Sequence, residues 1–236
     1  MDTELESMLD RADELLGDLE HEYKNCLKLQ NVTERAKNLA TEVLVKLRSA
    51  LDHAMRRFWE KNIAPNLHDQ KGKRAYVYFP ITNELKDFRS LLGQGKMPDL
   101  DKNHKKLYDF LLKQQPFSST ENRWLDTLTK IAGEAKHVRL IPQKRMEKIN
   151  RISVSRPGGA VSWDPSSVRF GAGVSVMSAR INPNTQRIVP TPGVIEKVEM
   201  LVAFTFDDYG IDALAFCKES CQKTRSLIEE MLNVFS

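Results

Sequence analysis

The residues best suited to chemistry lie in one short stretch, Leu47-Arg48-Ser49-Ala50-Leu51-Asp52-His53. An arginine can bind a phosphate through two parallel hydrogen bonds, and a histidine can transfer a proton near neutral pH. Together these two abilities are what metal-independent cleavage of RNA requires. The stretch therefore provides Arg48 and His53 as candidate catalytic residues, with Asp52 as a supporting residue beside Arg48.

The spacing of these residues on a helix leaves a second interpretation open. Arg48 and Asp52 are four residues apart and can form an ion pair within one helix. His53 is five residues from Arg48, which places it about 140° away around the helix axis. One regular helix cannot bring Arg48 and His53 to the same substrate atom, so a composite site needs a distorted helix or a second chain. In the alternative, the three residues only hold a helical bundle together, with His53 packed at a helix interface.

A second candidate stretch, Ala135-Lys136-His137-Val138-Arg139-Leu140, carries three potential cations. A basic run continues from it to Arg151, so Lys136, His137 and Arg139 are candidate residues for binding an anion or RNA. Two other interpretations stay open. The cations can stabilise the C-terminal end of a helix, or His137 or Arg139 can pair with Asp52 and tie two helices together.

No further cluster has the spacing of a metal or cofactor site. Cys217 and Cys221 would share one face of a helix, but no second pair of ligands is near them in the sequence. We interpret them as core residues. No glycine-rich phosphate loop precedes a helix, so we expect neither a metal nor a cofactor. A small, odd number of cysteines is typical of a reducing compartment, and we expect a cytoplasmic protein.

Charge is unevenly distributed along the chain. Its net charge is +4, yet residues 1–23 contain nine acidic residues and a single basic one, Arg11. Such an acidic segment can pair with the basic remainder of its own or a second chain, can accompany a basic surface that meets a polyanion, or can be solvated. No apolar run approaches the roughly 18 residues of a membrane span, and the first residues do not resemble a signal peptide.

The periodicity of apolar residues predicts an α+β fold. It predicts helices at 3–30, 33–61, 83–93, 101–113, 121–138 and 210–234, and Thr33 is suited to cap the second of them. Alternation and turn residues at 151–206 predict an antiparallel β-meander of about four to six strands, in which Val198, Val202 and Phe206 face a helix. We expect residues 1–150 to form a helical core and residues 151–236 to add the meander and a C-terminal helix that packs back on that core, as one integrated domain. The helices at 33–61, 121–138 and 210–234 should pack on one another.

Four sequence blocks resemble a group of bacterial and phage-associated proteins. They are the two stretches above together with Tyr78-Phe79-Pro80-Ile81 and Gln115-Pro116-Phe117. Separately, the spacing of Arg48 and His53 resembles the Arg-x4-His motif of HEPN domains, which are helical bundles found in toxins, defence systems and RNA-processing enzymes. This likeness extends to Arg48 and His53 only. HEPN domains usually have Asn, Asp or His directly after the arginine, where this chain has Ser49.

The HEPN resemblance implies a helical core and a homodimer in which the arginine and histidine of two subunits face each other. It implies metal-independent RNA cleavage or RNA binding in a nucleic-acid-related or defence setting, with Arg48 on the scissile phosphate and His53 as general acid or base. The expected partners are a second copy of the chain and RNA or another polyanion, and not a membrane. The alternative from a different class is a non-catalytic structural or interaction protein, in which Arg48, Asp52 and the histidines form a buried ion-pair cluster.

Overall fold

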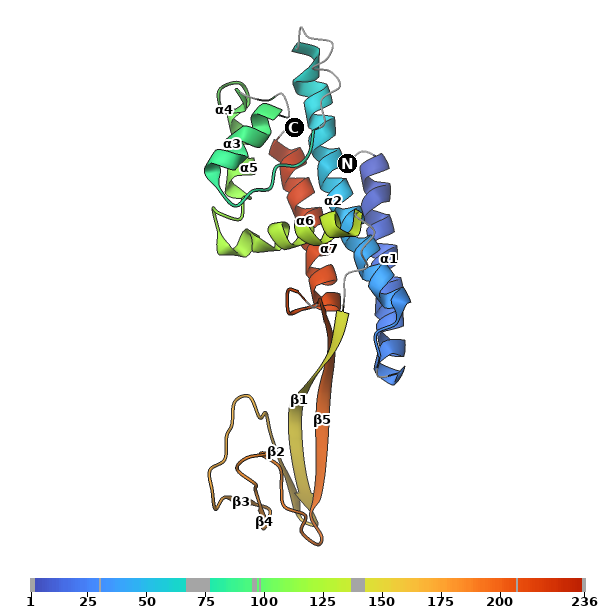
Figure 1. Cartoon of the computed structure of the whole chain (residues 1–236), viewed down its shortest axis with the longest axis vertical. Helices are drawn as coiled ribbons and strands as arrows, with labels where there is room; N and C mark the ends of the chain where they lie inside the picture. The colour runs from blue at the N-terminus through green and yellow to red at the C-terminus, as the bar shows by residue number, and fades with distance from the viewer. Residues whose placement is uncertain are drawn as a thin grey trace. The chain divides into compact units, whose positions relative to one another are not determined.

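The structure is a computed structural model that describes residues 3–29, 31–66, 77–94, 97, 99–136, 143–206 and 208–234. Over these residues the chain forms seven α-helices and six β-strands, together with short 3-10 turns (Figure 1). Helices and antiparallel strands occupy separate stretches of the chain, and this arrangement confirms the predicted α+β class.

The helices are α1 (Thr3–Leu29), α2 (Glu34–Asn62), α3 (Leu85–Gln94), α4 (Leu100–Asn103), α5 (Lys105–Lys113), α6 (Arg123–Lys136) and α7 (Ala213–Val234). The strands are β1 (Gln143–Arg156), β2 (Gly159–Trp163), β3 (Ser175–Val176), β4 (Ala179–Arg180), β5 (Ile195–Phe206) and β6 (Ile211–Asp212). The helices predicted at 3–30 and 33–61 match α1 and α2. The helix predicted at 101–113 is interrupted at His104, and the one predicted at 121–138 is preceded by a 3-10 turn, η3 (Thr120–Asn122).

The chain forms two compact units. The first contains residues 1–144 and 205–236, and the second contains residues 145–204. From the sequence we expected a division at residue 150, with the last helix following the strands in the chain and packing back on the helical core. The difference at residue 150 arises because β1 begins at Gln143, in a run where the apolar residues Met146 and Ile149 are three apart and do not alternate. The last helix, α7, belongs to the helical unit, where it contacts α1 and α2.

The helix α2 is central to the first unit. It runs alongside α1 and α7, and α6 crosses it (Figure 1). The predicted apolar stripe of α2 is buried and comprises Ala40, Val43, Leu44, Leu47, Leu51, Ala54 and Phe58. The predicted packing of this helix on those that contain residues 123–136 and 213–234 is therefore confirmed.

Thr33 fixes the turn between α1 and α2. Its hydroxyl accepts a hydrogen bond from Ala36 N at 3.1 Å, as predicted for a helix cap, and donates one to Glu22 Oε1 at 2.6 Å. Glu22 is buried, and Asn25 donates to its other oxygen at 3.3 Å. The hydrogen bond from Thr33 is the largest cause that holds the pKa of Glu22 below its ordinary value, against the opposing effect of burial. The carboxylate is therefore charged in the folded protein at neutral pH.

The acidic residues of α1 pair with basic residues of α2 and α7. Arg225 of α7 lies 2.8 Å from Asp13 and 3.3 Å from Asp10. Further pairs that join α1 to these two helices include Lys218–Glu20, Arg225–Glu6, Arg57–Glu4 and Arg35–Glu22. Pairing within one chain, one of the interpretations considered for the acidic segment, is therefore present in the structure.

The three cysteines are free, buried thiols, which confirms the prediction that Cys217 and Cys221 are core residues. Cys217 Sγ donates a weak hydrogen bond to Ala40 O at 3.7 Å, which places it between α7 and α2. Burial raises the pKa of Cys217 well above its ordinary value and that of Cys221 to about 12. Because the thiolate is the reactive and metal-binding form, these side chains act as small apolar residues at neutral pH.

The strands do not follow a simple meander. β1 and β2 form an antiparallel hairpin in which Ile152 is paired with Trp163, and Gly158 has a φ of 100° at its turn. β5 then lies next to β1 rather than next to β2, in the order β2-β1-β5-β6, and β3 and β4 pair separately. Ile152, Val154, Trp163 and Ile181 form the core of the second unit.

Of the three β5 residues predicted to face a helix, Phe206 does so. Phe206 packs edge to face on Phe216 of α7, with ring centroids 6.4 Å apart. Val198 is partly buried against the apolar core of the second unit. The side chain of Val202 lies outside the described residues.

The low pKa of Glu22 makes a prediction about acid stability. A carboxyl group whose pKa is lowered by folding stabilises the native state above its unfolded pKa, and this contribution is lost as the pH falls through the folded pKa. Glu22→Gln should therefore lower the free energy of unfolding at about pH 7, and its deficit relative to the wild type should shrink below about pH 4.5. Urea unfolding at several pH values measures this difference. Glu14→Gln, at an exposed position of the same helix, is the control, and a deficit that is the same at about pH 3 would contradict the prediction.

Candidate functional site

The Arg48 side chain is buried within the helical unit, with about 10% of its surface exposed. It forms an ion pair with Asp52, in which Nη2 lies 2.6 Å from Oδ1 and Nε lies 3.3 Å from Oδ2. The guanidinium also donates to Phe79 O at 2.9 Å and to Thr129 Oγ1 at 3.2 Å. All three nitrogens of the guanidinium are therefore engaged by the protein itself.

Asp52 completes a closed set of contacts with Phe79. Its Oδ1 accepts a hydrogen bond from Phe79 N at 2.9 Å, while Arg48 donates to the carbonyl oxygen of the same residue. Phe79 lies in an irregular segment, where no helix or strand provides hydrogen bonds for its backbone N–H and C=O groups. The Arg48–Asp52 pair thus supplies a donor and an acceptor to one peptide segment and joins α2 to that segment and, through Thr129, to α6.

Gln115 holds the same segment through its amide. Its side chain is fully buried, and its Nε2 donates to Pro80 O and Leu111 O, both at 2.8 Å. Its Oε1 accepts a hydrogen bond from Thr82 N at 3.0 Å. Three of the four blocks singled out in the sequence, those at 47–53, 78–81 and 115–117, therefore meet in one region and are linked by hydrogen bonds.

His53 lies on a different side of α2 from Arg48. Its Nε2 accepts a hydrogen bond from Arg57 at 3.3 Å and lies 3.6 Å from a carboxylate oxygen of Glu4 at the start of α1. Arg48, in contrast, contacts Phe79 and α6. Within one chain the structure does not bring Arg48 and His53 together, which agrees with the divergence expected for residues five apart on a regular helix.

The second candidate stretch is mostly outside the described residues. Lys136 is the last residue of α6, and nothing is described of its side chain. His137 and Arg139 follow it, beyond the described part of the chain. Their expected roles, in anion binding or in pairing with Asp52, stay predictions.

No family model, curated protein or solved structure matches the chain. Among the described residues no three His, Cys, Asp or Glu side chains gather closely enough to hold a metal ion. Within the described ranges, every helix is too short or too polar to cross a lipid bilayer.

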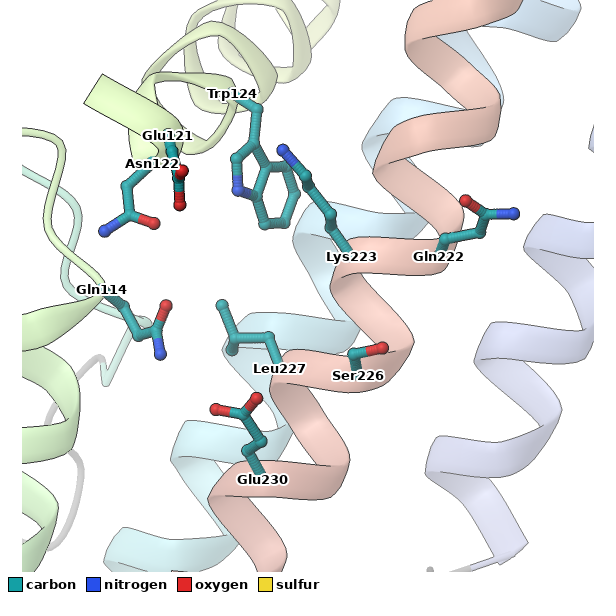
Figure 2. A pocket seen from close by; sticks show the side chains of 9 residues that line it. All are labelled: Gln114, Glu121, Asn122, Trp124, Gln222, Lys223, Ser226, Leu227 and Glu230. Carbon is teal, nitrogen blue, oxygen red and sulfur yellow. The ribbon is translucent and has the colours of Figure 1, made fainter. Parts of the chain in front are cut away.

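A cleft that the sequence analysis did not predict lies between α7 and the segment that joins α5 to α6 (Figure 2). Its volume is about 570 Å³, within the range of small-ligand sites. Trp124 and Leu227 provide mostly buried apolar surface. The polar residues around it are Gln114, Glu121, Asn122, Gln222, Lys223, Ser226 and Glu230.

Local hydrogen bonds fix the segment that lines one side of this cleft. Asn122 Nδ2 donates to Lys113 O at 2.8 Å, which ties η3 to the end of α5, and Ser119 caps η3. On the other side, Lys223, Leu227 and Glu230 recur at the i, i+4, i+7 spacing that puts residues on one face of a helix. That spacing is visible in the sequence, but the sequence gives no sign that this face of α7 lies opposite Glu121 and Trp124.

The burial of the Arg48–Asp52 pair makes a prediction about stability. Asp52→Asn should lower the free energy of unfolding by about 3 kcal/mol, because it leaves the Arg48 charge buried without its partner. The matched control is Glu60→Gln, which removes one partner of the exposed Arg56–Glu60 pair on the same helix and should change stability by less than about 1 kcal/mol. Urea unfolding of both variants tests the difference. Equal, small effects of the two substitutions would contradict a structural role for Asp52.

Proposed function

We propose that this chain is a non-catalytic interaction protein in which Arg48 and Asp52 hold the helical unit together. One observation carries the proposal: the Arg48 guanidinium is buried and donates to Asp52, to Phe79 O and to Thr129. An arginine that binds a scissile phosphate presents its paired N–H groups to the substrate. Here those groups face the protein's own carboxylate and carbonyl.

The energetics of the ion pair support the same proposal. For Arg48 to bind a phosphate, it would have to leave Asp52, and this mostly buried carboxylate would lose its partner. Stranding one charge of a buried pair costs about 3–5 kcal/mol. Substrate binding would have to supply that free energy, and the Phe79 carbonyl would lose a donor at the same time.

The HEPN-like ribonuclease is the second candidate function. It is favoured by the position of His53, which is partly exposed on a different side of α2 from Arg48. Such divergence suits a composite site in which Arg48 of one subunit meets His53 of another, and it makes a homodimer a requirement of this hypothesis. RNA is then the partner, in the nucleic-acid-related or defence setting and the cytoplasmic location that the sequence suggested.

An RNA cleavage assay distinguishes the two functions. The protein is incubated with end-labelled single-stranded RNA in the presence of EDTA, because neither Arg48 nor His53 needs a metal for the proposed chemistry. We expect no cleavage above the protein-free rate. Arg48→Ala should unfold at a lower temperature, because it strands the charge of Asp52. His53→Ala should cost less stability than Arg48→Ala, and His21→Ala, at an exposed histidine of α1, is the control that should cost least.

The proposal is contradicted by cleavage that is lost in both Arg48→Ala and His53→Ala while both variants stay folded and His21→Ala stays active. In that case the two inactive variants are mixed. Recovery of cleavage in the mixture would establish a site shared between two chains, because a heterodimer keeps one composite site intact.

A further inference from the structure

The cleft beside α7 combines an aromatic surface with two unpaired carboxylates. Glu121 and Glu230 are exposed at its rim, and within the described part of the chain neither carboxylate has an ion pair or hydrogen bond. The carboxylates of α1 provide a contrast, because several of them are paired with basic residues of α2 and α7. The two carboxylates of the cleft are therefore available to a ligand.

The contact of Lys223 with Trp124 indicates that the indole ring attracts cations. The Lys223 ammonium lies 5.8 Å from the centroid of the Trp124 ring, within the range of a cation–π interaction. Figure 2 shows the Lys223 side chain reaching toward the indole. Lys223 also pairs with Glu219 on α7, so its charge is compensated outside the cleft and it can withdraw from the ring without losing its partner.

The arrangement of the charges suits more than one cationic group. In the view of Figure 2 the carboxylates of Glu121 and Glu230 lie above and below Leu227. The side-chain amides of Gln114 and Asn122 line the same space and provide oxygen acceptors. The methylene groups of a lysine or arginine side chain can pack on Trp124 and Leu227 while its charged end reaches a carboxylate.

We propose that this cleft binds lysine or arginine side chains of a basic segment of a partner protein. The inference rests on the proposed function, that the chain acts by binding, and it names the site and the chemistry of the partner. The carboxylates at the rim bind the cationic groups, and Trp124 and Leu227 bind the alkyl parts of the same side chains. Lys223 competes with the incoming cation for the indole face.

Titration with short capped peptides tests the proposal. The probe is acetyl-tetralysine amide, with acetyl-tetraglutamate amide as the charge control and spermidine as a free polyamine. Binding is followed by calorimetry and by the amide and indole signals of the ¹⁵N-labelled full-length protein. We expect tetralysine to bind, to weaken as salt is added, and to shift the Trp124 indole signal and not those of the other two tryptophans.

Variants locate the binding in the cleft. Glu121→Gln and Glu230→Gln should each weaken tetralysine binding about three- to fivefold, the effect of losing one partly exposed ion pair. Lys223→Met should strengthen binding, because it removes the competing cation. The matched control is Glu229→Gln, which removes an exposed carboxylate next to Glu230 but outside the cleft and should leave the affinity unchanged. Melting temperatures confirm that each variant is folded.

Three results would overturn the proposal. The first is an unchanged affinity in both cleft variants, and the second is a loss in Glu229→Gln as large as that in Glu230→Gln, which would indicate general attraction to an acidic surface. The third is binding of spermidine without binding of tetralysine, which would assign the cleft to a free polyamine. RNA cleavage in the earlier assay would instead contradict the proposed function, and it is measured independently of peptide binding.

Discussion

A buried guanidinium is stable only where the protein replaces the water that it has lost. Arg48 meets this condition through Asp52 one helical turn away and through two acceptors far along the chain, Phe79 O and Thr129 Oγ1. The central helix, the irregular segment at 77–82 and α6 are joined at this point. The backbone N–H and C=O groups of an irregular segment have no regular hydrogen-bond partners in a helix or sheet. The placement of this segment therefore depends on side chains such as Asp52 and Gln115.

This constraint changes how the most suggestive sequence pattern is interpreted. Arg48 and His53 are residue types that a metal-independent ribonuclease uses. In the structure, however, Arg48 is buried and bonded to Asp52 and Phe79 O, and His53 contacts Glu4 and Arg57. We therefore favour binding over catalysis. The cleft near Trp124 then becomes the more informative surface, because its carboxylates, unlike Arg48, are not engaged by the described part of the protein.

Features governed by neighbouring residues were predictable from the sequence. The buried stripe of α2, the Thr33 cap, the Arg48–Asp52 pair and the divergence of His53 all follow from helical spacing. Contacts between distant residues were not predictable: Phe79 and Thr129 are 31 and 81 residues from Arg48. The packing of Val198 on the core of the second unit was missed for the same reason, because distant residues such as Ile152 and Trp163 form that core. The early start of β1 was missed for a local reason, because Met146 and Ile149 do not alternate. The cleft required knowledge of which helix faces α7.

A double-mutant cycle on Arg48 and Asp52 is the most direct test of the central claim. The free energy of unfolding is measured in urea for the wild type, Arg48→Met, Asp52→Asn and the double variant. If the pair is a buried structural contact, the double variant should lose less stability than the sum of the two single losses by more than about 1 kcal/mol, because no charge is left stranded. Additive effects, or an Arg48→Met variant as stable as the wild type, would contradict the claim that this pair holds the helical unit together.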